Sequence, residues 1–381
     1  MQSTTEDRTL NPFPWYRRMR ETDPIHFYPE YRAWQVFRYD DVLRVLSDSA
    51  AFSSNISGGH ERQDPLAASL VTTDPPRHRQ LRNLVTQAFT PRSVAALTDR
   101  ITTIVNDLLD RVVAQGQMDV VDDLAYPLPV IVIAEMLGIP REDRDRFKAW
   151  SDAIVGASLG GGKPQAEMSA YFLQMIEQRR QEPRDDLISA LLNAQIEGVH
   201  LTRRELLGFC VLLLVAGNET TTNLIGNAVL CFDEHPEVMA ELRVAPDLIP
   251  GAIEEVLRYR SPVQMMYRRV AADVDLDGRP LQAGQMVMAQ IGSANRDEAQ
   301  FPDADRFDIR RAPNRHLAFG HGIHFCLGAP LARLESKIAL TLMLDRLPEM
   351  HRVRTVALQG LGSPIVYGVK HLPITFHASA A

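Results

Sequence analysis

Hydrophobic residues recur at intervals of three and four positions along the middle of the chain. The segment 97–113 shows this spacing at Leu97, Ile101, Ile104, Val105, Leu108, Leu109 and Val112. Similar spacing occurs over 187–194 and over the much longer segment 203–232. Because the interval matches the 3.6 residues of a helical turn, we predict helices over all three segments.

Short runs typical of β-strands lie nearer the two ends of the chain, at 33–37, 271–276 and 286–289. Asp277-Gly278 and Gly284 supply the turn residues between the last two runs. We therefore predict a mainly α-helical protein with small β-sheets. No internal repeat or convincing linker divides it, so we expect a single domain over 1–381 with an N-terminal tail of about ten residues.

Composition narrows the functional class. The 381 residues are 45% hydrophobic and 23% charged, which is the balance of a globular protein. The net charge of −7 disfavours nucleic-acid binding, which usually needs an excess of basic residues. The three cysteines do not form a disulfide or zinc pattern. The N-terminus is polar and the most apolar stretch is short, so we expect a cytoplasmic protein without a membrane anchor.

The segment 319–328 places a single cysteine, Cys326, in a loop with three glycines ahead of a predicted helix. Glycine allows the positive φ angles and the close backbone approach that a flat ligand requires. A helix that begins near Cys326 would direct its N-terminal N–H groups at the sulfur, which favours the thiolate. A cysteine that only fills space in a core has no need of this arrangement.

A polar group interrupts the long apolar segment at Glu219 and Thr220. Ala216 and Thr220 are four residues apart and share a helical face, with Glu219 beside them. An acid next to a hydroxyl inside an apolar helix is costly unless it is paired or functional. The alternative for Thr220 is a hydrogen bond from its hydroxyl to a carbonyl of its own helix.

Two further pairs have helical spacing. His78 and Arg82 are four residues apart and able to hold an anion together. Glu255 and Arg258 are three apart and able to form an ion pair, although that spacing alone is weak evidence.

These motifs resemble those of the cytochrome P450 family. The six fixed positions of its pattern Phe-Gly-x-Gly-x-His-x-Cys-x-Gly are all present, as Phe319, Gly320, Gly322, His324, Cys326 and Gly328. The segment 216–222 resembles the oxygen-activation motif, 73–82 the C helix, and 255–258 with 301–307 the K helix and meander. The resemblance runs from about Asn11 to the C-terminus. It implies the P450 fold, a triangular prism with heme b between the long I helix and the L helix.

The resemblance also implies roles for individual residues. Cys326 is the expected iron ligand. Thr220 is expected to hydrogen-bond the bound oxygen and Glu219 to relay protons, while Gly217 leaves room for a local widening of the helix. Glu255, Arg258 and Arg306 are the expected structural cluster under the cysteine loop. The other expected heme contacts are His78, Arg82, Arg269 and His324 at the propionates, with Phe319, Gly320, Ala216 and Gly328.

By position against the family, a further set of residues is expected over the face of the heme opposite Cys326. These are Leu212, Val215, Ala216, Met265, Met266, Tyr267, Ile365 and Val366. The set is apolar and rich in methionine, which favours a hydrophobic substrate, although each member is about as well explained as core. The implied activity is a monooxygenase that takes two external electrons and hydroxylates or epoxidises a hydrophobic small molecule.

The chain shows no fused flavin or ferredoxin domain, so a ferredoxin with its reductase, or another redox partner, is expected to supply electrons to a monomer. Arginines expected near the cysteine are a plausible dock for an acidic ferredoxin: Arg79, Arg310, Arg311, Arg315 and Arg333. Solvated surface charge is the alternative. Two other functions stay open, a peroxide-driven hydroxylase and a non-catalytic heme-thiolate ligand-binding protein. Glu219 and Thr220 favour the monooxygenase over both.

Overall fold

Helices make up most of the computed structural model, which describes residues 9–57, 65–87, 90–143, 146–147, 149–150, 163–195 and 198–378. Residues 1–8 of the predicted tail lie outside this part. The helices are α2 (Phe13–Thr22), α3 (Tyr39–Ser47), α4 (Arg77–Thr86), α5 (Pro91–Ala95), α6 (Thr98–Asp110), α7 (Pro127–Met136), α9 (Lys163–Gln181), α10 (Leu187–Asn193), α11 (Arg203–Glu234), α12 (Pro236–Val244), α13 (Ile249–Tyr259), α14 (Ile291–Ala294) and α15 (Ala329–Arg346). The predictions for 97–113, 187–194 and 203–232 are confirmed as α6, α10 and α11.

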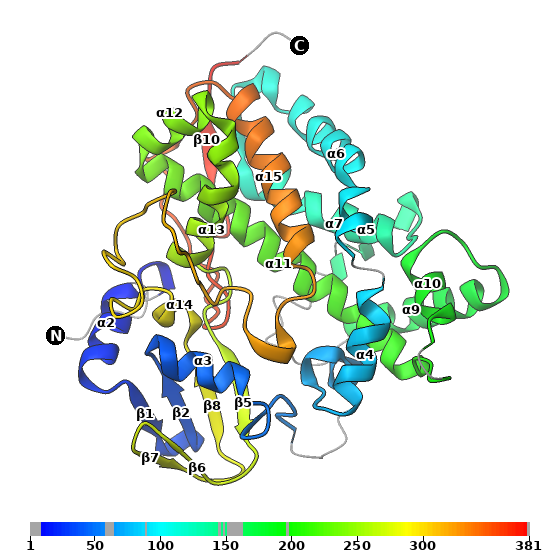
Figure 1. Ribbon diagram of the computed structural model, residues 1–381. Helices are drawn as coiled ribbons and strands as arrows, with labels where there is room; N and C mark the ends of the chain where they lie inside the picture. Colours follow the sequence, from blue (N-terminus) through cyan, green and yellow to red (C-terminus); the bar gives the residue numbers. More distant parts are fainter. Residues whose placement is uncertain are drawn as a thin grey trace.

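Helix α11 runs through the middle of the molecule and packs against α7, α13 and α15 (Figure 1). A capping box begins it: the Thr202 hydroxyl accepts from the Glu205 N–H, and the Glu205 carboxylate accepts from the Thr202 N–H. The helix is long and apolar enough to cross a membrane, but 61% of its most apolar window is buried inside the fold. Its hydrophobic residues therefore serve the protein core.

Gly217 lets α11 cross α7 closely. A Cβ atom at this position would overlap the Cδ1 atom of Ile133 on α7. The helix is α-helical through residues 216–222, so the predicted local widening is not present. The absence of a side chain at Gly217 gives room to Ile133 where the two helices cross.

The strands form three small sheets. A five-stranded sheet has the order β1 (Ile25–Tyr28), β2 (Ala33–Val36), β8 (Met286–Ala289), β5 (Met266–Val270) and β3 (Phe52–Ser53). A second has the order β4 (Gln117–Asp119), β10 (Pro373–Thr375) and β9 (His351–Arg352), and β6 (Val274–Leu276) pairs with β7 (Arg279–Leu281). The predicted runs correspond to β2, β6 and β8. Strand β5 was not predicted, because its two arginines obscure the pattern.

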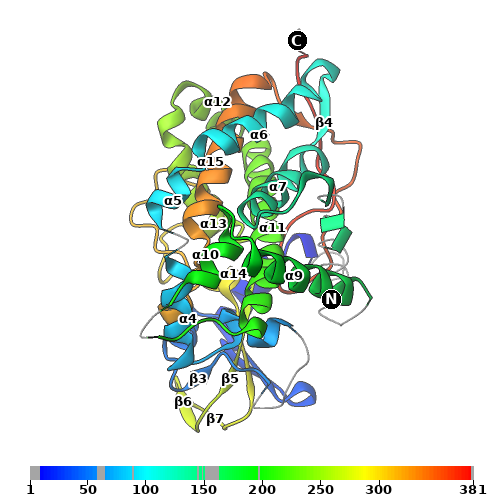
Figure 2. The same ribbon diagram turned by 90° about the vertical axis from the view of Figure 1, so that its right-hand side faces the viewer.

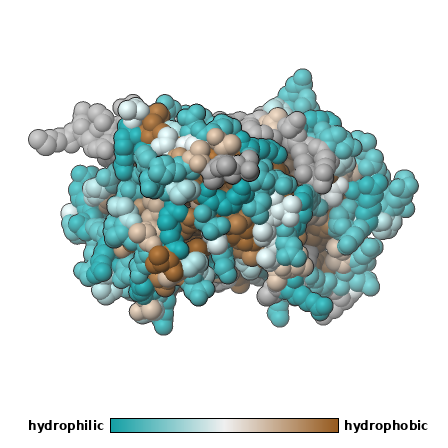
Figure 3. Space-filling model, turned by 90° about the horizontal axis from the view of Figure 1, so that it is seen from above, coloured by the Kyte–Doolittle hydropathy of each residue, from teal (hydrophilic) through white to brown (hydrophobic). Residues whose placement is uncertain are grey.

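The five-stranded sheet and the helices form separate parts of the core. Figure 2 shows this sheet below the helical body. A large hydrophobic cluster fills the helical part, and a smaller one packs α3 against the sheet. Seen from above, the surface is mostly hydrophilic, and the hydrophobic residues form small patches among the hydrophilic ones (Figure 3). The cysteine loop precedes α15 and contacts α3, so it lies between the two parts.

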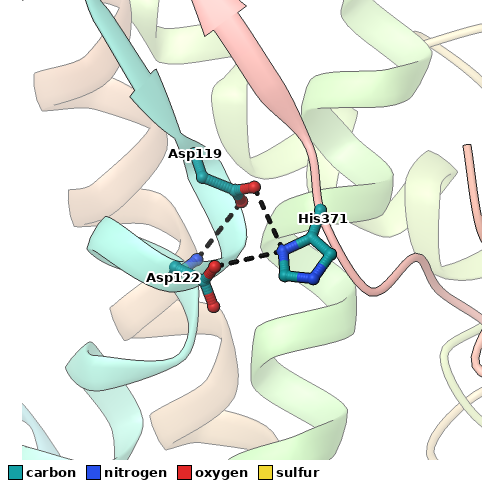
Figure 4. A group of neighbouring side chains, drawn as sticks. All are labelled: Asp119, Asp122 and His371. Atoms are coloured by element: carbon teal, nitrogen blue, oxygen red, sulfur yellow. Dashed lines mark hydrogen bonds and ion pairs between the residues drawn. The ribbon is translucent and has the colours of Figure 1, made fainter. Parts of the chain in front are cut away.

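A histidine and two aspartates tie β10 to β4 (Figure 4). His371 Nδ1 lies 3.1 Å from Asp122 Oδ2 and 3.4 Å from Asp119 Oδ2. The other oxygen of Asp119 accepts hydrogen bonds from the backbone N–H groups of Val121 and Leu372. These contacts give the group a structural role in the second sheet.

Glu255 and Arg258 form an ion pair that is fully buried beneath the meander segment. The Arg258 guanidinium donates to both oxygens of Glu255 and to the carbonyls of Asn295, Ala304 and Arg306. Asn295 Oδ1 in turn accepts from Leu317 N–H, two residues before the cysteine loop. The pair therefore supports the chain that leads to Cys326, as the resemblance implied.

The third member of the cluster is Arg311, and the expectation for Arg306 is wrong. The Arg306 side chain is exposed, and only its carbonyl reaches the cluster. The Arg311 guanidinium is buried, lies 3.3 Å from Glu255 Oε1, and donates to the carbonyls of Pro302, Asp303 and Arg306. A buried carboxylate needs its donors at close range, and of Arg306 and Arg311 only Arg311 has its side chain placed to provide one.

Removing these arginines one at a time should separate their roles. Arg258→Ala leaves Glu255 buried without its main partner, so the free energy of unfolding should fall by about 3–5 kcal/mol. Arg311→Ala should cost about 1–3 kcal/mol, because carbonyls and part of the Glu255 charge lose a donor. Arg306→Ala should change stability by less than about 0.5 kcal/mol. Urea denaturation followed by circular dichroism measures all three, and an Arg306→Ala loss as large as that of Arg311→Ala would contradict the assignment.

Candidate functional site

The cysteine loop is closed by a hydrogen bond from the Cys326 N–H to the carbonyl of Phe319, at 2.8 Å. Gly320 and Gly322 have φ angles of 71° and 69°, a region that favours glycine. A Cβ atom on Gly322 would also lie 3.1 Å from the Cα of Ser47 on α3. Gly328 has an ordinary φ of −81°, so its backbone angle does not require glycine.

The sulfur of Cys326 lies at the start of α15, which begins at Ala329. Burial raises the pKa of the Cys326 thiol. The N–H groups of Gly328 and Ala329 and the charges of Arg82 and Arg333 lower this pKa, but less than burial raises it. The two N–H groups therefore act on the thiol in the predicted direction, although burial outweighs them. A stable thiolate here requires a further positive charge, such as a metal ion, beside the sulfur.

Two imidazoles and a guanidinium gather between α4 and the cysteine loop. The rings of His78 and His324 are 4.3 Å apart, and the Nε2 atom of each is buried without a hydrogen-bond partner. Burial, together with the nearby His78 and Arg268, lowers the pKa of His324 to about 3. Arg82 lies one turn after His78 on α4 and forms no ion pair with any carboxylate in the described residues. His78 and His324, two of the expected propionate contacts, therefore lie side by side, and Arg82 follows one turn later on α4.

Arg268 joins this group, and the expectation for Arg269 is wrong. The Arg268 side chain is buried, and its charge acts directly on His324. Burial lowers the pKa of Arg268 to about 10. Arg269 is on the opposite face of β5, where its guanidinium lies near Gly284. Successive residues of a strand point to opposite faces, so a shift of one position changes which arginine reaches the site.

Glu219 and Thr220 lie on α11 at partly exposed positions. The Thr220 hydroxyl donates to the carbonyl of Ala216 at 2.6 Å, which is the hydrogen bond considered as the alternative for this residue. Burial raises the pKa of Glu219 to about 7. Among the described residues, Glu219 has no hydrogen-bond or ion-pair partner, so burial alone governs its protonation.

The structure brings together one part of the expected substrate lining. Val263 bridges to Val366, and the Gln264 N–H donates to the carbonyl of Ile365, so Met265 lies beside this C-terminal segment. Strand β5 separates Met266, on the face of Arg268, from Tyr267 on the other face.

The rest of the expected lining is on α11. Leu212 and Ala216 are eight and four residues before Thr220 and share its face, while Val215 is beside them. Leu212 and Val215 are partly buried and pack against the large hydrophobic cluster, whereas Ala216 is exposed.

The surface beside the cysteine loop carries fewer free arginines than expected. Arg310 pairs with Glu241, Arg333 with Glu254, and Arg311 is buried in the Glu255 cluster. Arg79 and Arg315 are exposed and have no ion pair within the part of the chain that is described. Phe325, next to Cys326, has 42% of its surface exposed.

Two residues of the site were missed at the level of the sequence, Arg268 and Arg311. Each belongs to an Arg-Arg pair, at 268–269 and 310–311. The sequence analysis chose Arg269 in place of Arg268, and Arg306 in place of Arg311. Recognising strand β5 would have shown that only one member of 268–269 reaches a given face.

Comparison with known proteins agrees with this geometry. A family model described as Cytochrome P450 matches residues 162–348. The putative cytochrome P450 YjiB of Bacillus subtilis is 44% identical over 372 residues, covering 94% of this chain and 92% of that protein. The cyclomarin C epoxidase CymV of Salinispora arenicola is 44% identical over 376 residues, covering 95% of each.

The fold is shared with solved structures as well. The structure of CYP109E1 from Bacillus megaterium in complex with testosterone matches with a TM-score of 0.92 and 45% identity, covering 98% of this chain and 100% of that one. Identity at this level over nearly the full length shows common family membership, and the likeness extends to the mainly helical architecture with small sheets. The chain therefore belongs to the cytochrome P450 family and is a heme-dependent monooxygenase.

Proposed function

We propose that this monooxygenase holds heme b and activates O2 at a site with three parts. These are Cys326, the Glu219–Thr220 pair, and the four side chains of His78, Arg82, Arg268 and His324, which we call the cationic group after its two arginines. The observation that carries the proposal is the cationic group itself. His78, Arg82, Arg268 and His324 gather without an ion-paired carboxylate in the described residues, and two of their nitrogen atoms are buried and unpartnered. Buried polar groups are normally satisfied, so this one is suited to an anionic ligand.

The residues fit heme b on both of its chemical features. The propionates are two carboxylates, and guanidinium and imidazole N–H groups are their natural donors. The iron is a cation, and it supplies the positive charge that the buried Cys326 sulfur lacks. Cys326 would hold the iron, and a heme bound through a thiolate would supply the redox chemistry for the activation of O2.

Glu219 and Thr220 are the proposed proton-handling residues. A carboxyl group with a pKa near 7 is close to half-protonated at neutral pH, so Glu219 is able to accept and to release a proton. The Thr220 hydroxyl gives its hydrogen to the Ala216 carbonyl, which leaves the oxygen lone pairs able to accept a hydrogen bond. A non-catalytic heme protein or a peroxide-driven hydroxylase needs neither residue.

The substrate is proposed to be a hydrophobic small molecule that is hydroxylated or epoxidised. Support comes from the apolar side chains near Thr220 on α11 and from the Met265 region beside Ile365 and Val366. The similar CYP109E1 structure contains testosterone, and CymV is named as an epoxidase. A steroid is therefore a sensible first probe for this chain.

We further propose a cytoplasmic, monomeric protein of one domain that takes its electrons from a ferredoxin and ferredoxin reductase. None of the three cysteines is in a disulfide, which fits a reducing compartment. The large hydrophobic residues exposed in the described part are Tyr31, Val244, Phe325 and Val356. No two of them adjoin in sequence, which gives little support for a large apolar interface.

The proposed ferredoxin dock is the surface formed by Arg79, Arg315 and Phe325. An acidic partner is attracted by the two unpaired arginines, and an exposed aromatic ring next to the iron ligand gives it an apolar contact.

The oxygen-activation assignment predicts how tightly electron use is coupled to product. Hydrogen peroxide released per NAD(P)H consumed, with testosterone as first probe, should rise as the pH increases through about 7, because Glu219 loses its proton there. Glu219→Gln should remove this pH dependence. Thr220→Ala should raise peroxide release at every pH, by roughly tenfold.

The conservative variant Thr220→Ser is the control, since it keeps the hydroxyl and should stay near the wild-type ratio. Coupling in Thr220→Ala that equals that of the native enzyme would count against the role of Thr220. A pH dependence that persists in Glu219→Gln would assign the titration to another group.

The two adjacent arginines of β5 give a matched test of heme binding. Arg268→Ala should speed the transfer of heme to excess apomyoglobin by roughly tenfold, the effect of losing one charge-assisted hydrogen bond. Arg269→Ala should leave the rate unchanged, because its side chain is on the other face of the strand. Faster loss from Arg269→Ala than from Arg268→Ala would reverse the assignment.

The docking surface is tested by charge reversal. Arg79→Glu together with Arg315→Glu should raise the KM for reduced ferredoxin roughly tenfold and weaken its dependence on ionic strength, with little change in kcat. Arg18→Glu together with Arg180→Glu, at exposed arginines on α2 and α9, is the control, because it makes the same change in net charge. Equal effects of the two changes would show only a general response to net charge.

A further inference from the structure

Asp74 is an acidic residue at the edge of the cationic group, and the functions above do not use it. Its carboxylate accepts hydrogen bonds from the Ser53 hydroxyl and, at 2.9 Å, from the Ser54 N–H. Its main-chain carbonyl accepts from the His78 N–H at 3.0 Å. Asp74 therefore joins the end of strand β3 to the first turn of helix α4.

This connection reaches both elements that carry the cationic group. Strand β3 pairs with β5, and Ser53 lies opposite Arg269, one residue from Arg268. Helix α4 carries His78 and Arg82. A shift of Asp74 would therefore change the separation between the cations of α4 and the cation of β5.

Asp74 also acts on the group through its charge. Burial lowers the pKa values of His78, His324 and Arg268, and attraction to Asp74 offsets part of that lowering for each of them. Within the described residues, none of the three lies within ion-pair distance of the Asp74 carboxylate. The serine donors hold the carboxylate, so Asp74 occupies no N–H group of His78, His324 or Arg268.

We propose that Asp74 is a positioning residue for heme: it fixes the spacing of α4 and β5, and its charge stabilises the buried Arg268 guanidinium at longer range without forming an ion pair with it. The inference rests on the proposed assignment of the cationic group to the propionates. A carboxylate in direct contact with the cationic group would compete with the heme propionates for its donors. A carboxylate at longer range stabilises the positive charge and leaves those donors available.

Two substitutions separate the link from the charge. Asp74→Ala removes both, and transfer of heme from the holoenzyme to excess apomyoglobin should become roughly tenfold faster. Asp74→Asn keeps an acceptor for the Ser54 N–H, and its amide N–H can donate to Ser53 Oγ in place of the hydrogen bond that is lost, so the link is kept while the charge is removed. Its heme release should stay within about threefold of the native rate. Its midpoint reduction potential should become more positive, because loss of a nearby negative charge disfavours the oxidised iron.

Asp48→Asn is the matched control, because Asp48 also accepts a backbone hydrogen bond near β3, from the Ala51 N–H, and the substitution makes the same change in charge. Its potential should shift less than that of Asp74→Asn. A reduction potential in Asp74→Asn that equals that of Asp48→Asn would overturn the electrostatic role. This measurement decides the matter even if Asp74→Ala does not fold.

Arg268→Ala distinguishes failure of this inference from failure of the heme assignment. Fast heme release from Arg268→Ala with native behaviour of both Asp74 variants would overturn the role of Asp74 alone. If Arg268→Ala and Asp74→Ala, each as a single variant, both release heme at the native rate, the proposed propionate site is overturned, and the inference with it.

Discussion

A sulfur anion in a buried place is stable only where positive charge meets it, and this constraint shapes the region around Cys326. The start of α15 contributes two N–H groups, and Arg82 and Arg333 contribute charge, yet burial still raises the pKa of the thiol. The protein thus supplies part of the stabilisation and leaves the rest to a cation. Iron in heme b is such a cation, and the family to which the chain belongs uses it.

The same principle explains where the carboxylates are placed. Glu255 lies close to the cysteine loop but is held by Arg258 and Arg311, so its charge is fully used in supporting the loop. Asp74 is held by serine donors and acts on the cations only at longer range. Glu219, which has no described partner, is on α11, a different element from those that carry the cationic group. Acidic groups are therefore kept from the donors that the heme propionates would need.

The chemistry of the site was easier to predict from the sequence than the directions in which individual side chains point. A tight motif such as 319–328 determines a local loop, so the positive φ angles at Gly320 and Gly322 were predicted correctly, whereas Gly328 does not have one. The long helices were also predictable from hydrophobic spacing. Arg268 and Arg311 were missed because which of two neighbouring residues is buried depends on strand pairing and on the path of the meander. Gly217 was misread for a similar reason, since its neighbour Ile133 comes from a different helix.

The central claim is that the thiolate of Cys326 is the axial ligand of the heme iron. It is tested most directly by the Soret band of the reduced, carbon-monoxide-bound protein. The account predicts a strongly red-shifted band in the native protein and, in Cys326→His, a band at the position typical of histidine-ligated heme. A folded, heme-loaded native protein without the red-shifted band, or a Cys326→Ser variant that retains it, would contradict the account.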